Sequence, residues 1–309
     1  MDINVERGKP LLPQLNKYKV YYLMLLPIIA WYIVFCYAPM GGILVAFENY
    51  DPFKGFFKSQ WIGFHWFTYL FTSLDFGRAL RNTLLINLYS WIFAFPAPII
   101  LALLLNECRH VAFKRIVQTV SYLPHFISWA ITAGLLVTLL SPSSGIVNQV
   151  MKLIGIEPIY FMAESSYTRT IIVASSIWKG VGWGSILYLA SLTGINPELY
   201  EAARLDGASK WMQVWHITLP GMSNIIVMQL LFMLTSLVDV GFEQAYTIVN
   251  KATYETGLVI STYIYNVGVK QGEYSFTTAV GLAQSVVGML LLIGANAMTR
   301  KFKPDGAIW

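Results

Sequence analysis

Few residues in the apolar parts of this sequence could do chemistry, and most of them suit the same ligand. Aromatic rings can stack on the face of a sugar ring, while amide and ammonium groups can hydrogen-bond its hydroxyls. The apolar stretches contain eight residues of these types: Asn87, Tyr89, Trp91, Trp129, Trp178, Lys179, Trp183 and Gln229. They are our candidates for a substrate pathway.

Each candidate also has a simpler interpretation. Tryptophan and tyrosine side chains often face lipid or lie at the membrane interface. Lys179 differs from them, because an ammonium group is costly in lipid and an intramembrane lysine usually faces a cavity or a partner. Alternatively, its flexible side chain reaches outward so that the charge lies at the outer interface. The sequence leaves both interpretations of Lys179 open.

Other kinds of chemistry find little support. The four histidines (His65, His110, His125 and His216) are scattered, and there is no HExxH motif. There is also no GxxxxGK[ST] loop, so we do not expect this chain to bind ATP itself. A secondary transporter would need a carboxylate deep inside an apolar stretch, and none is present. We therefore expect no catalytic residue, metal or cofactor; a secondary transporter, or a membrane-embedded enzyme, is the alternative function.

The composition indicates a membrane protein. Of the 309 residues, 56% are hydrophobic and only 12% are charged, whereas about 25% of a soluble protein is charged. The mean hydropathy is +0.56. The two cysteines, Cys36 and Cys108, lie within or beside apolar runs, so no disulfide framework is predicted.

Six apolar segments are candidate membrane spans, since a helix that crosses a membrane needs about 20 predominantly apolar residues. We therefore predict an all-α membrane protein with six transmembrane helices. A proline in the Tyr122-Leu123-Pro124-His125 stretch is expected to break the helix that enters the third span. The predicted spans are approximately 20–47, 84–105, 126–140, 170–192, 225–240 and 276–297.

The distribution of charge predicts the orientation. Six spans place both termini on one side, and that side carries 12 of the 21 Lys and Arg residues. Because basic residues near span ends favour the cytoplasmic side, we expect both termini in the cytoplasm. Residues 1–79 then form an N-terminal segment, a first span and an aromatic segment (48–79) that lies at the headgroups or contacts an external partner. Residues 80–298 form the core, and 299–309 form a cytoplasmic tail.

A polar insert, residues 196–220, separates the fourth and fifth spans on the cytoplasmic side. Asn196 and Pro197 predict the start of a helix, which Gly207 ends. Ser209 caps a second helix, in which Trp211, Val214 and Trp215 share one face, and Pro220 ends it. The insert is thus predicted to be a compact helical knob that another protein could grasp.

The insert resembles the cytoplasmic coupling motif of binding-protein-dependent ABC importer permeases, which reads E-A-A, three residues, G, and then I-x-L-P. An amphipathic helix pair lying on lipid would explain the tryptophan face but not this glycine and proline spacing. Asn82-Thr83-Leu84 resembles the N-T-L that opens the core of these permeases. The matching positions in the insert are Glu201, Ala202, Ala203, Gly207, Ile217, Leu219 and Pro220.

The last third of the chain is similar to the LplB-like branch of the type I carbohydrate permeases, in residues 240–244, 262–265 and 274–281. This resemblance implies a five-helix core plus one N-terminal helix in the bacterial plasma membrane. The implied function is import of a carbohydrate, often an oligosaccharide from plant polysaccharides. The implied partners are a second permease subunit, two ATPase subunits that carry ATP and magnesium, a solute-binding protein and membrane lipid, and no nucleic acid is expected.

Overall fold

The structure is a computed structural model that describes residues 18–302, and almost all of this part of the chain is helical. Our predictions for the polar segment 1–17 and for the tail residues 303–309 lie outside the described residues. The elements in chain order are α2 (Lys19–Tyr32), η1 (Ile33–Tyr37), α3 (Ala38–Met40), η2 (Gly41–Phe47), β1 (Glu48–Asn49), β2 (Gln60–Trp61), α4 (His65–Leu70), α5 (Leu74–Tyr89), η3 (Ser90–Ala94), α6 (Pro96–Glu107), α7 (Val111–Tyr122), η4 (Leu123–Phe126), α8 (Trp129–Leu139), α9 (Ile146–Leu153), η5 (Ser165–Tyr167), α10 (Thr168–Leu192), α11 (Pro197–Leu205), α12 (Lys210–Gln213), η6 (Val214–Thr218), α13 (Leu219–Gly221), α14 (Ser223–Thr235), α15 (Phe242–Ile248), η7 (Lys251–Thr253), α16 (Tyr254–Gly257), α17 (Ile260–Ile264), η8 (Tyr265–Lys270) and α18 (Tyr274–Phe302).

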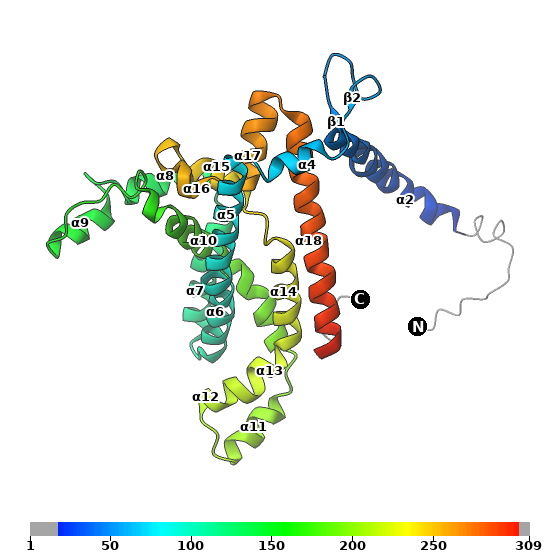
Figure 1. The fold of residues 1–309 in the computed structure, drawn as a ribbon. Helices are drawn as coiled ribbons and strands as arrows, with labels where there is room; N and C mark the ends of the chain where they lie inside the picture. Colours follow the sequence, from blue (N-terminus) through cyan, green and yellow to red (C-terminus); the bar gives the residue numbers. More distant parts are fainter. Residues whose placement is uncertain (1–17, 303–309) are drawn as a thin grey trace.

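Four continuous helical rods are long and apolar enough to cross a membrane: Lys19–Phe47, Leu74–Glu107, Ser165–Leu192 and Tyr274–Lys301. Two bent helix pairs pass the same test only when each pair is taken together: Val111–Phe126 with Trp129–Leu139, bent by 108°, and Lys210–Gly221 with Ser223–Thr235, bent by 63°. Residues 18–302 therefore contain four candidate spans by length and composition, or up to six if each bent pair is one span. Figure 1 shows the rods side by side, with α2 leaning away from the others.

Three helices pass through a proline by widening before it. A proline removes one backbone donor and its ring clashes with the carbonyl four residues back. The π-helical segments η1, η3 and η6 each end two residues before a proline, at Pro39, Pro96 and Pro220. The wider turn gives the ring room, so the helix continues through each proline.

Helix α10 lies at the centre of the bundle. It packs against α6, α7, η3 and η4, and also against α14. Near its start, Ile172 and Val173 belong to a core shared with Ile86 of α5 and Ala245 of α15. Near its end, Tyr188 packs in a second core with residues of α6 and with Met222, which precedes α14. The long helix thus joins both ends of the core.

The third span is built differently from our prediction. We expected one helix over 126–140, and α8 (Trp129–Leu139) lies within that range, but it is bent by 108° from the helix before it. The segment that packs along α10 is this preceding helix, α7, while α8 packs against α15. Hydropathy marked only α8, because α8 is far more apolar than α7, which carries Lys114, Arg115 and Gln118.

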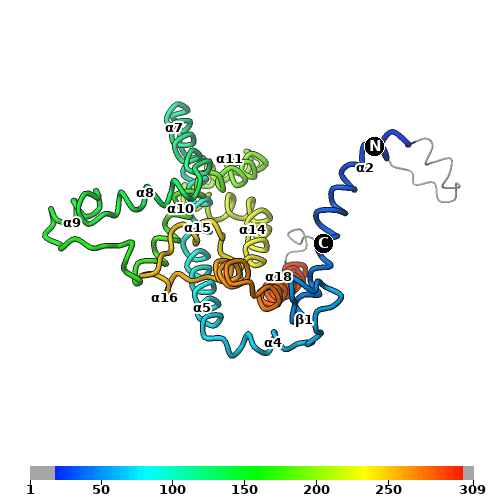
Figure 2. The backbone as a smooth tube through the Cα atoms, turned by 90° about the horizontal axis from the view of Figure 1, so that it is seen from above, coloured from blue at the N-terminus to red at the C-terminus, as the bar shows by residue number. Residues whose placement is uncertain are grey.

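The second span begins earlier than predicted, at Leu74 instead of residue 84, because Ser73 caps it by accepting a hydrogen bond from the Phe76 N–H at 3.3 Å. Before it, the aromatic segment forms a short hairpin in which Glu48 pairs with Trp61. The Trp66 indole donates to the Glu48 carbonyl at 3.0 Å, and α4 packs on α18. Seen from above, α2 with this hairpin and the α8–α9 arm lie on opposite sides of the bundle (Figure 2).

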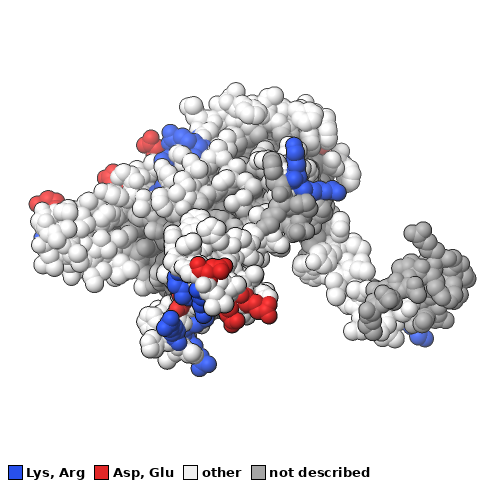
Figure 3. All heavy atoms as spheres, turned by 90° about the horizontal axis from the view of Figure 1, so that it is seen from below, with Lys and Arg blue, Asp and Glu red and all other residues white. Residues whose placement is uncertain are grey.

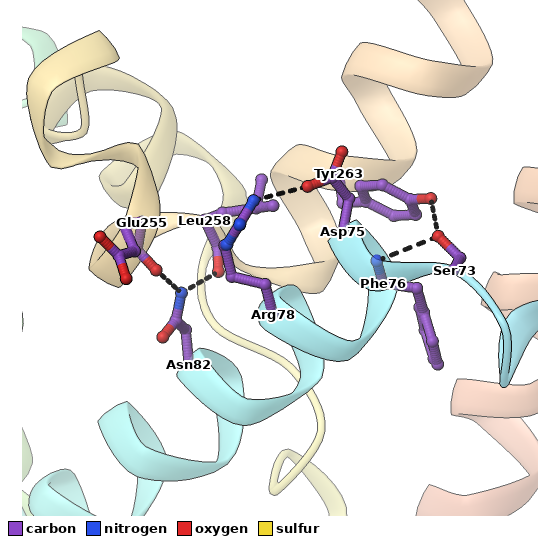
Figure 4. Close-up of polar contacts among 8 residues, drawn as sticks. All are labelled: Ser73, Asp75, Phe76, Arg78, Asn82, Glu255, Leu258 and Tyr263. Atoms are coloured by element: carbon purple, nitrogen blue, oxygen red, sulfur yellow. Dashed lines mark hydrogen bonds and ion pairs between the residues drawn. The ribbon is translucent and has the colours of Figure 1, made fainter.

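Asn82 and Thr83, in the predicted N-T-L stretch, fasten α5 to the loop before α17. Asn82 Nδ2 donates to the carbonyls of Glu255 at 2.9 Å and Leu258 at 3.0 Å, while Thr83 Oγ1 accepts from the Ile260 N–H at 3.0 Å. Asn82 and Thr83 are fully buried. Buried backbone groups must find partners, so these side chains fix the loop on the helix (Figure 4).

Two further contacts hold the same end of α5. Tyr263 and Ser73 share a hydrogen bond of 3.2 Å, and Arg78 pairs with Asp75 at 2.6 Å (Figure 4). Burial raises the pKa of the Tyr263 hydroxyl, which therefore stays protonated in this contact at neutral pH. The first contact ties the start of α5 to α17 at the outer end of the bundle, where outer means the end opposite the insert, and the second joins two residues within α5.

We predict that Gly182→Ala destabilises the bundle, because a Cβ there would lie 2.1 Å from the Ser121 carbonyl oxygen of α7. The two helices would have to separate, and overpacking of this kind costs about 1–3 kcal/mol. Gly180→Ala is the matched control, since nothing lies within 4 Å of its Cβ position. The measurement is the thermal unfolding of each purified variant in detergent; equal stabilities would contradict the close packing of α7 on α10.

Candidate functional site

The first helix of the insert, α11, begins and ends as predicted. The Asn196 side chain accepts from the Glu198 N–H at 3.0 Å, and Pro197 is the first helical residue. At the other end, Gly207 has a φ of +79°. Its N–H donates to the Arg204 carbonyl at 3.1 Å, and the Ala208 N–H donates to that of Ala203 at 2.8 Å. These two bonds form a Schellman motif, which requires the left-handed residue to be glycine or similarly permissive.

The second helix of the insert runs through α12, η6 and α13. The Ser209 side chain caps it by accepting from the Met212 N–H at 3.3 Å. Trp211 and Trp215 lie on one face as predicted, with ring centroids 5.8 Å apart. Their exposed fractions are 67% and 54%. Large aromatic faces that stay exposed beside charged residues are typical of interaction sites.

Polar side chains that we did not single out from the sequence hold the two helices of the insert together. Gln213 is buried and donates from Nε2 to the Ala208 carbonyl at 3.0 Å, across the turn. The hydroxyls of Tyr200 and Thr218 lie 3.0 Å apart and join the two helices. Their spacing of 18 residues gives no local signal, so only the tertiary structure reveals this contact.

The base of the insert is tightly packed against the bundle. A Cβ on Gly221 would lie 2.7 Å from Ile195 Cδ1, so the chain enters and leaves the insert in close contact. Lys210 pairs with Glu107 of α6 at 2.7 Å, but both side chains are well exposed, and such pairs add little stability. Packing, more than charge, therefore fixes the insert on α10 and α14.

The seven motif residues divide into two groups. Glu201, Ala202 and Gly207 are exposed on the knob, and Ala203 beside them is half-buried. Ile217 and Leu219 are half-buried near the base, and Pro220 adjoins them. The first group can contact a partner, while the second helps to form the joint between the knob and α14. Seen from below, charged side chains gather over the knob and the nearby helix ends, whereas most of the remaining surface is uncharged (Figure 3).

Lys179 has partners within this chain. Its ammonium group donates to the backbone carbonyls of Pro124 at 3.3 Å and His125 at 2.9 Å, and to that of Ile127. The Trp129 ring centroid lies 5.3 Å from the Nζ atom. These carbonyls lie where the third span breaks, so Lys179 supplies donors that the helix lacks there.

Trp129 and Trp183 gather at the same break as Lys179. The Trp183 indole stacks on the His125 ring, with centroids 4.5 Å apart and an interplanar angle of 3°. Trp129 is half-buried and packs on the core cluster beneath the break. Residues 179, 182 and 183 of α10 thus contact the broken span together.

The remaining candidates are dispersed. Asn87 donates to the carbonyls of Leu237 at 2.8 Å and Asp239 at 3.1 Å, so it fastens the chain after α14. Trp178 lines an apolar cavity of about 360 Å³ between α8 and α10. Tyr89 lines a different cavity, between α5 and α10. Trp91 is half-buried with no partner for its indole Nε1, and Gln229 is a half-buried residue of α14. A single chain therefore does not bring the eight residues into one site.

Comparison with known proteins agrees with the coupling motif. The sequence model of a family described as "Binding-protein-dependent transport system inner membrane component" matches residues 94–304. Protein LplB of Bacillus subtilis (strain 168) is 42% identical over 300 residues, which are 97% of this chain and 94% of that protein. The polygalacturonan/rhamnogalacturonan transport system permease protein YteP of the same organism is 41% identical over 301 residues, again 97% and 94%.

A solved structure is equally similar. It is the crystal structure of a bacterial ABC transporter involved in the import of the acidic polysaccharide alginate, and one of its chains is 42% identical to this chain. The match has a TM-score of 0.89 and covers 96% of this chain and all of that one. The resemblance that we drew from the insert and from the last third of the sequence is thus confirmed.

We predict that Lys179→Met destabilises the chain, because it removes the ammonium donor from the carbonyls of His125 and Ile127, whereas that of Pro124 keeps its bond from the Ile127 N–H. The loss is expected to be about 1–3 kcal/mol, the cost of an unsatisfied buried polar group. Lys179→Arg keeps a charged donor, so its stability is expected to lie between those of the wild type and the Lys179→Met variant. Lys152→Met, on exposed α9, is the control. Thermal unfolding of the purified chains is the measurement, and a Met variant as stable as the wild type would show that the break does not depend on Lys179.

Proposed function

Because the chain belongs to the family of binding-protein-dependent transport system inner membrane components, as a permease subunit of an ABC importer for sugars, we propose that its insert is the part through which ATPase subunits drive transport. The chain is a transporter subunit and not an enzyme. The observation that carries the proposal is the construction of the insert: a braced helical knob, closed by Gly207, with an exposed aromatic face at the end of α10.

A lever must be stiff and firmly attached. The Gln213–Ala208 and Tyr200–Thr218 hydrogen bonds make the two insert helices one body, and Gly221 packed on Ile195 joins that body to the spans. We propose that an ATPase subunit binds the exposed group, Glu201, Ala202, Ala203 and Gly207, together with the Trp211 and Trp215 face. Ile217, Leu219 and Pro220 would then transmit the movement of the knob to α14.

We propose six spans with both termini in the cytoplasm, on the side of the insert. Two observations support this orientation. The described end of α18 lies at the same end of the bundle as the insert (Figure 1), and the basic residues that bracket the spans concentrate on that side. The bacterial plasma membrane is the location we infer for the assembled protein.

The complete importer, as we propose it, contains a second permease subunit, two ATPase subunits that hold ATP and magnesium, and a solute-binding protein outside. This chain would bind no nucleotide. Helix α2 has no buried residue, which suits contact with lipid or with another subunit. The substrate pathway would form between the two permeases, so candidates such as Tyr89, Trp178 and Gln229 would be completed by partner side chains.

We further propose that the substrate is an acidic oligosaccharide. The names of two relatives support this: one transports polygalacturonan or rhamnogalacturonan, and one imports the acidic polysaccharide alginate. These two relatives are 41% and 42% identical to this chain. Uptake of trigalacturonate by the complete importer reconstituted in vesicles is the direct test of this substrate class.

We predict that Gly207→Pro abolishes uptake while the chain still inserts into the membrane. Proline fixes φ near −65° and removes an N–H, whereas Gly207 has a φ of +79° and donates to Arg204. Gly155→Pro is the matched control: Gly155 has the same φ and donates to Lys152, but it lies after α9 at the outer end. The readouts are ATPase co-purification and sugar uptake. Normal co-purification and uptake by the Gly207 variant would remove the insert from its role.

The orientation can be tested by cysteine labelling in a chain whose two native cysteines are replaced by serine. Phe53, at the hairpin tip, and Leu205, on the knob, are 101% and 90% exposed and lie at opposite ends of the bundle. A membrane-impermeant thiol reagent is expected to label Phe53→Cys in intact cells and Leu205→Cys only after permeabilisation. The reverse pattern would overturn the proposed orientation.

A further inference from the structure

We propose that the cavity between α5 and α10, at the outer end of the bundle, is a subsite for a carboxylate of the transported sugar, and that Arg169 binds this carboxylate. The inference rests on the proposed acidic substrate. It adds a binding residue that neither the residue types nor the coupling motif pointed to.

The cavity has the size and lining of a small-molecule site. Its volume is about 480 Å³, which falls in the range typical of ligand pockets. Its lining includes the rings of Tyr89 and Phe93, the Arg169 guanidinium, and the hydroxyls of Ser166 and Thr170. The Ser166 hydroxyl also donates to Glu164 Oε1 at 3.4 Å. The other lining residues, Val173, Ala174 and Ile177, are apolar. Such a lining offers a ring face, hydroxyl partners and one fixed positive charge.

Arg169 is a charged group with no acidic partner in the part of the chain that the structure describes. Its Nη2 donates to Asn82 Oδ1 at 2.9 Å, and Asn82 is neutral. Its Nε is buried and has no hydrogen-bond partner. The ion pairs found among residues 18–302 do not include it. A partly buried guanidinium without an anion is costly, so a position of this kind favours an anionic ligand.

The guanidinium is held in a defined orientation. Both amide hydrogens of Asn82 are used on the carbonyls of Glu255 and Leu258, so its oxygen must face Arg169. Asn82 is fully buried and cannot turn away. It is therefore a positioning residue for Arg169, and the fork of donors on Arg169 is prepared before a ligand arrives. Planar, bidentate contact with a carboxylate is the interaction that arginine makes best.

The local field adds to the preference for an anion. Arg169 is the second residue of α10, whose first turn contains no acidic residue and whose preceding residue, Tyr167, makes no side-chain cap. The positive end of a helix favours anions and disfavours cations, so the basic residue there raises the local positive potential further. A uronate residue combines the carboxylate that this field selects with a ring and hydroxyls that suit Tyr89, Ser166 and Thr170.

The experiment uses the assembled permease–ATPase complex and two monosaccharide probes, galacturonate and galactose. A ligand that binds the folded state raises the unfolding temperature. We expect galacturonate, but not galactose, to raise that of the wild-type complex. The effect should disappear in Arg169→Gln and be weakened in Arg169→Lys, which keeps the charge but loses the fork. Arg78→Gln, which removes an outer arginine paired with Asp75, should keep the full effect.

Uptake in vesicles with the binding protein separates this inference from the proposed function. We expect Arg169→Gln to lower trigalacturonate uptake at least tenfold, with Arg78→Gln close to the wild type. Wild-type uptake of trigalacturonate without any galacturonate effect, or with the same effect in Arg169→Gln, would overturn the inference and leave the function standing. Failure of the wild type to take up trigalacturonate would refute the acidic substrate class and the inference with it. If Arg169→Gln does not fold, Arg169→Lys carries the test, and an undiminished galacturonate effect in it would count against the carboxylate contact.

Discussion

The hold of Lys179 on the broken third span is the interaction on which the arrangement of the bundle depends. Inside a membrane every backbone carbonyl must find a donor within the protein, and a helix break leaves several without one. Here the break over Leu123–Ile127 would expose carbonyls beside α10. One ammonium group on α10 donates to three of them and lies against the Trp129 ring. The 108° turn between η4 and α8 is therefore compatible with a membrane interior.

Single amides do the same work at the other irregular places. Asn82 holds the loop before α17, and Asn87 holds the chain that leaves α14. The Nε2 of Gln244 donates to the Ile172 carbonyl at 2.7 Å and so ties α15 to α10. In the insert, Gln213 spans the turn. Each amide satisfies its own hydrogen bonds on backbone carbonyls of another segment, which is why these polar residues stabilise the fold instead of weakening it.

Helix α10 connects the features that matter for transport. Arg169 lies at its outer end, Lys179 near its middle, and the insert follows its inner end, so all three are fixed to one 25-residue helix. Contacts along α6, α7 and α14 keep that helix within the bundle. A force applied to the knob would reach the outer end of the bundle through a rigid element and not through a chain of loops. The helix thus connects the proposed ATPase contact with the proposed sugar subsite.

Local patterns in the sequence were sufficient for the insert and for most of the spans. Asn196, Gly207 and Ser209 act on backbone groups at most a few residues away, so their roles can be predicted from order alone. Apolar runs likewise mark spans, because the side chains of a helix that crosses the hydrocarbon core must be predominantly apolar. At the third span they marked only α8, because α7, which packs along α10, is far less apolar. Hydropathy measures composition and not position.

The partners of Lys179 and Arg169 were decided by the tertiary structure alone. A lysine in an apolar run predicts only that its charge needs a partner; here the partners are carbonyls more than 50 residues earlier in the chain. Nothing in the sequence around Arg169 indicates its partner, because Asn82 of α5 lies 87 residues away. Residue types and motif spacing thus predicted a membrane permease with a helical knob between two spans. Which charges bind backbone carbonyls and which lack an acidic partner in the described residues depended on packing between distant helices, because hydrogen bonds act only over a few ångströms.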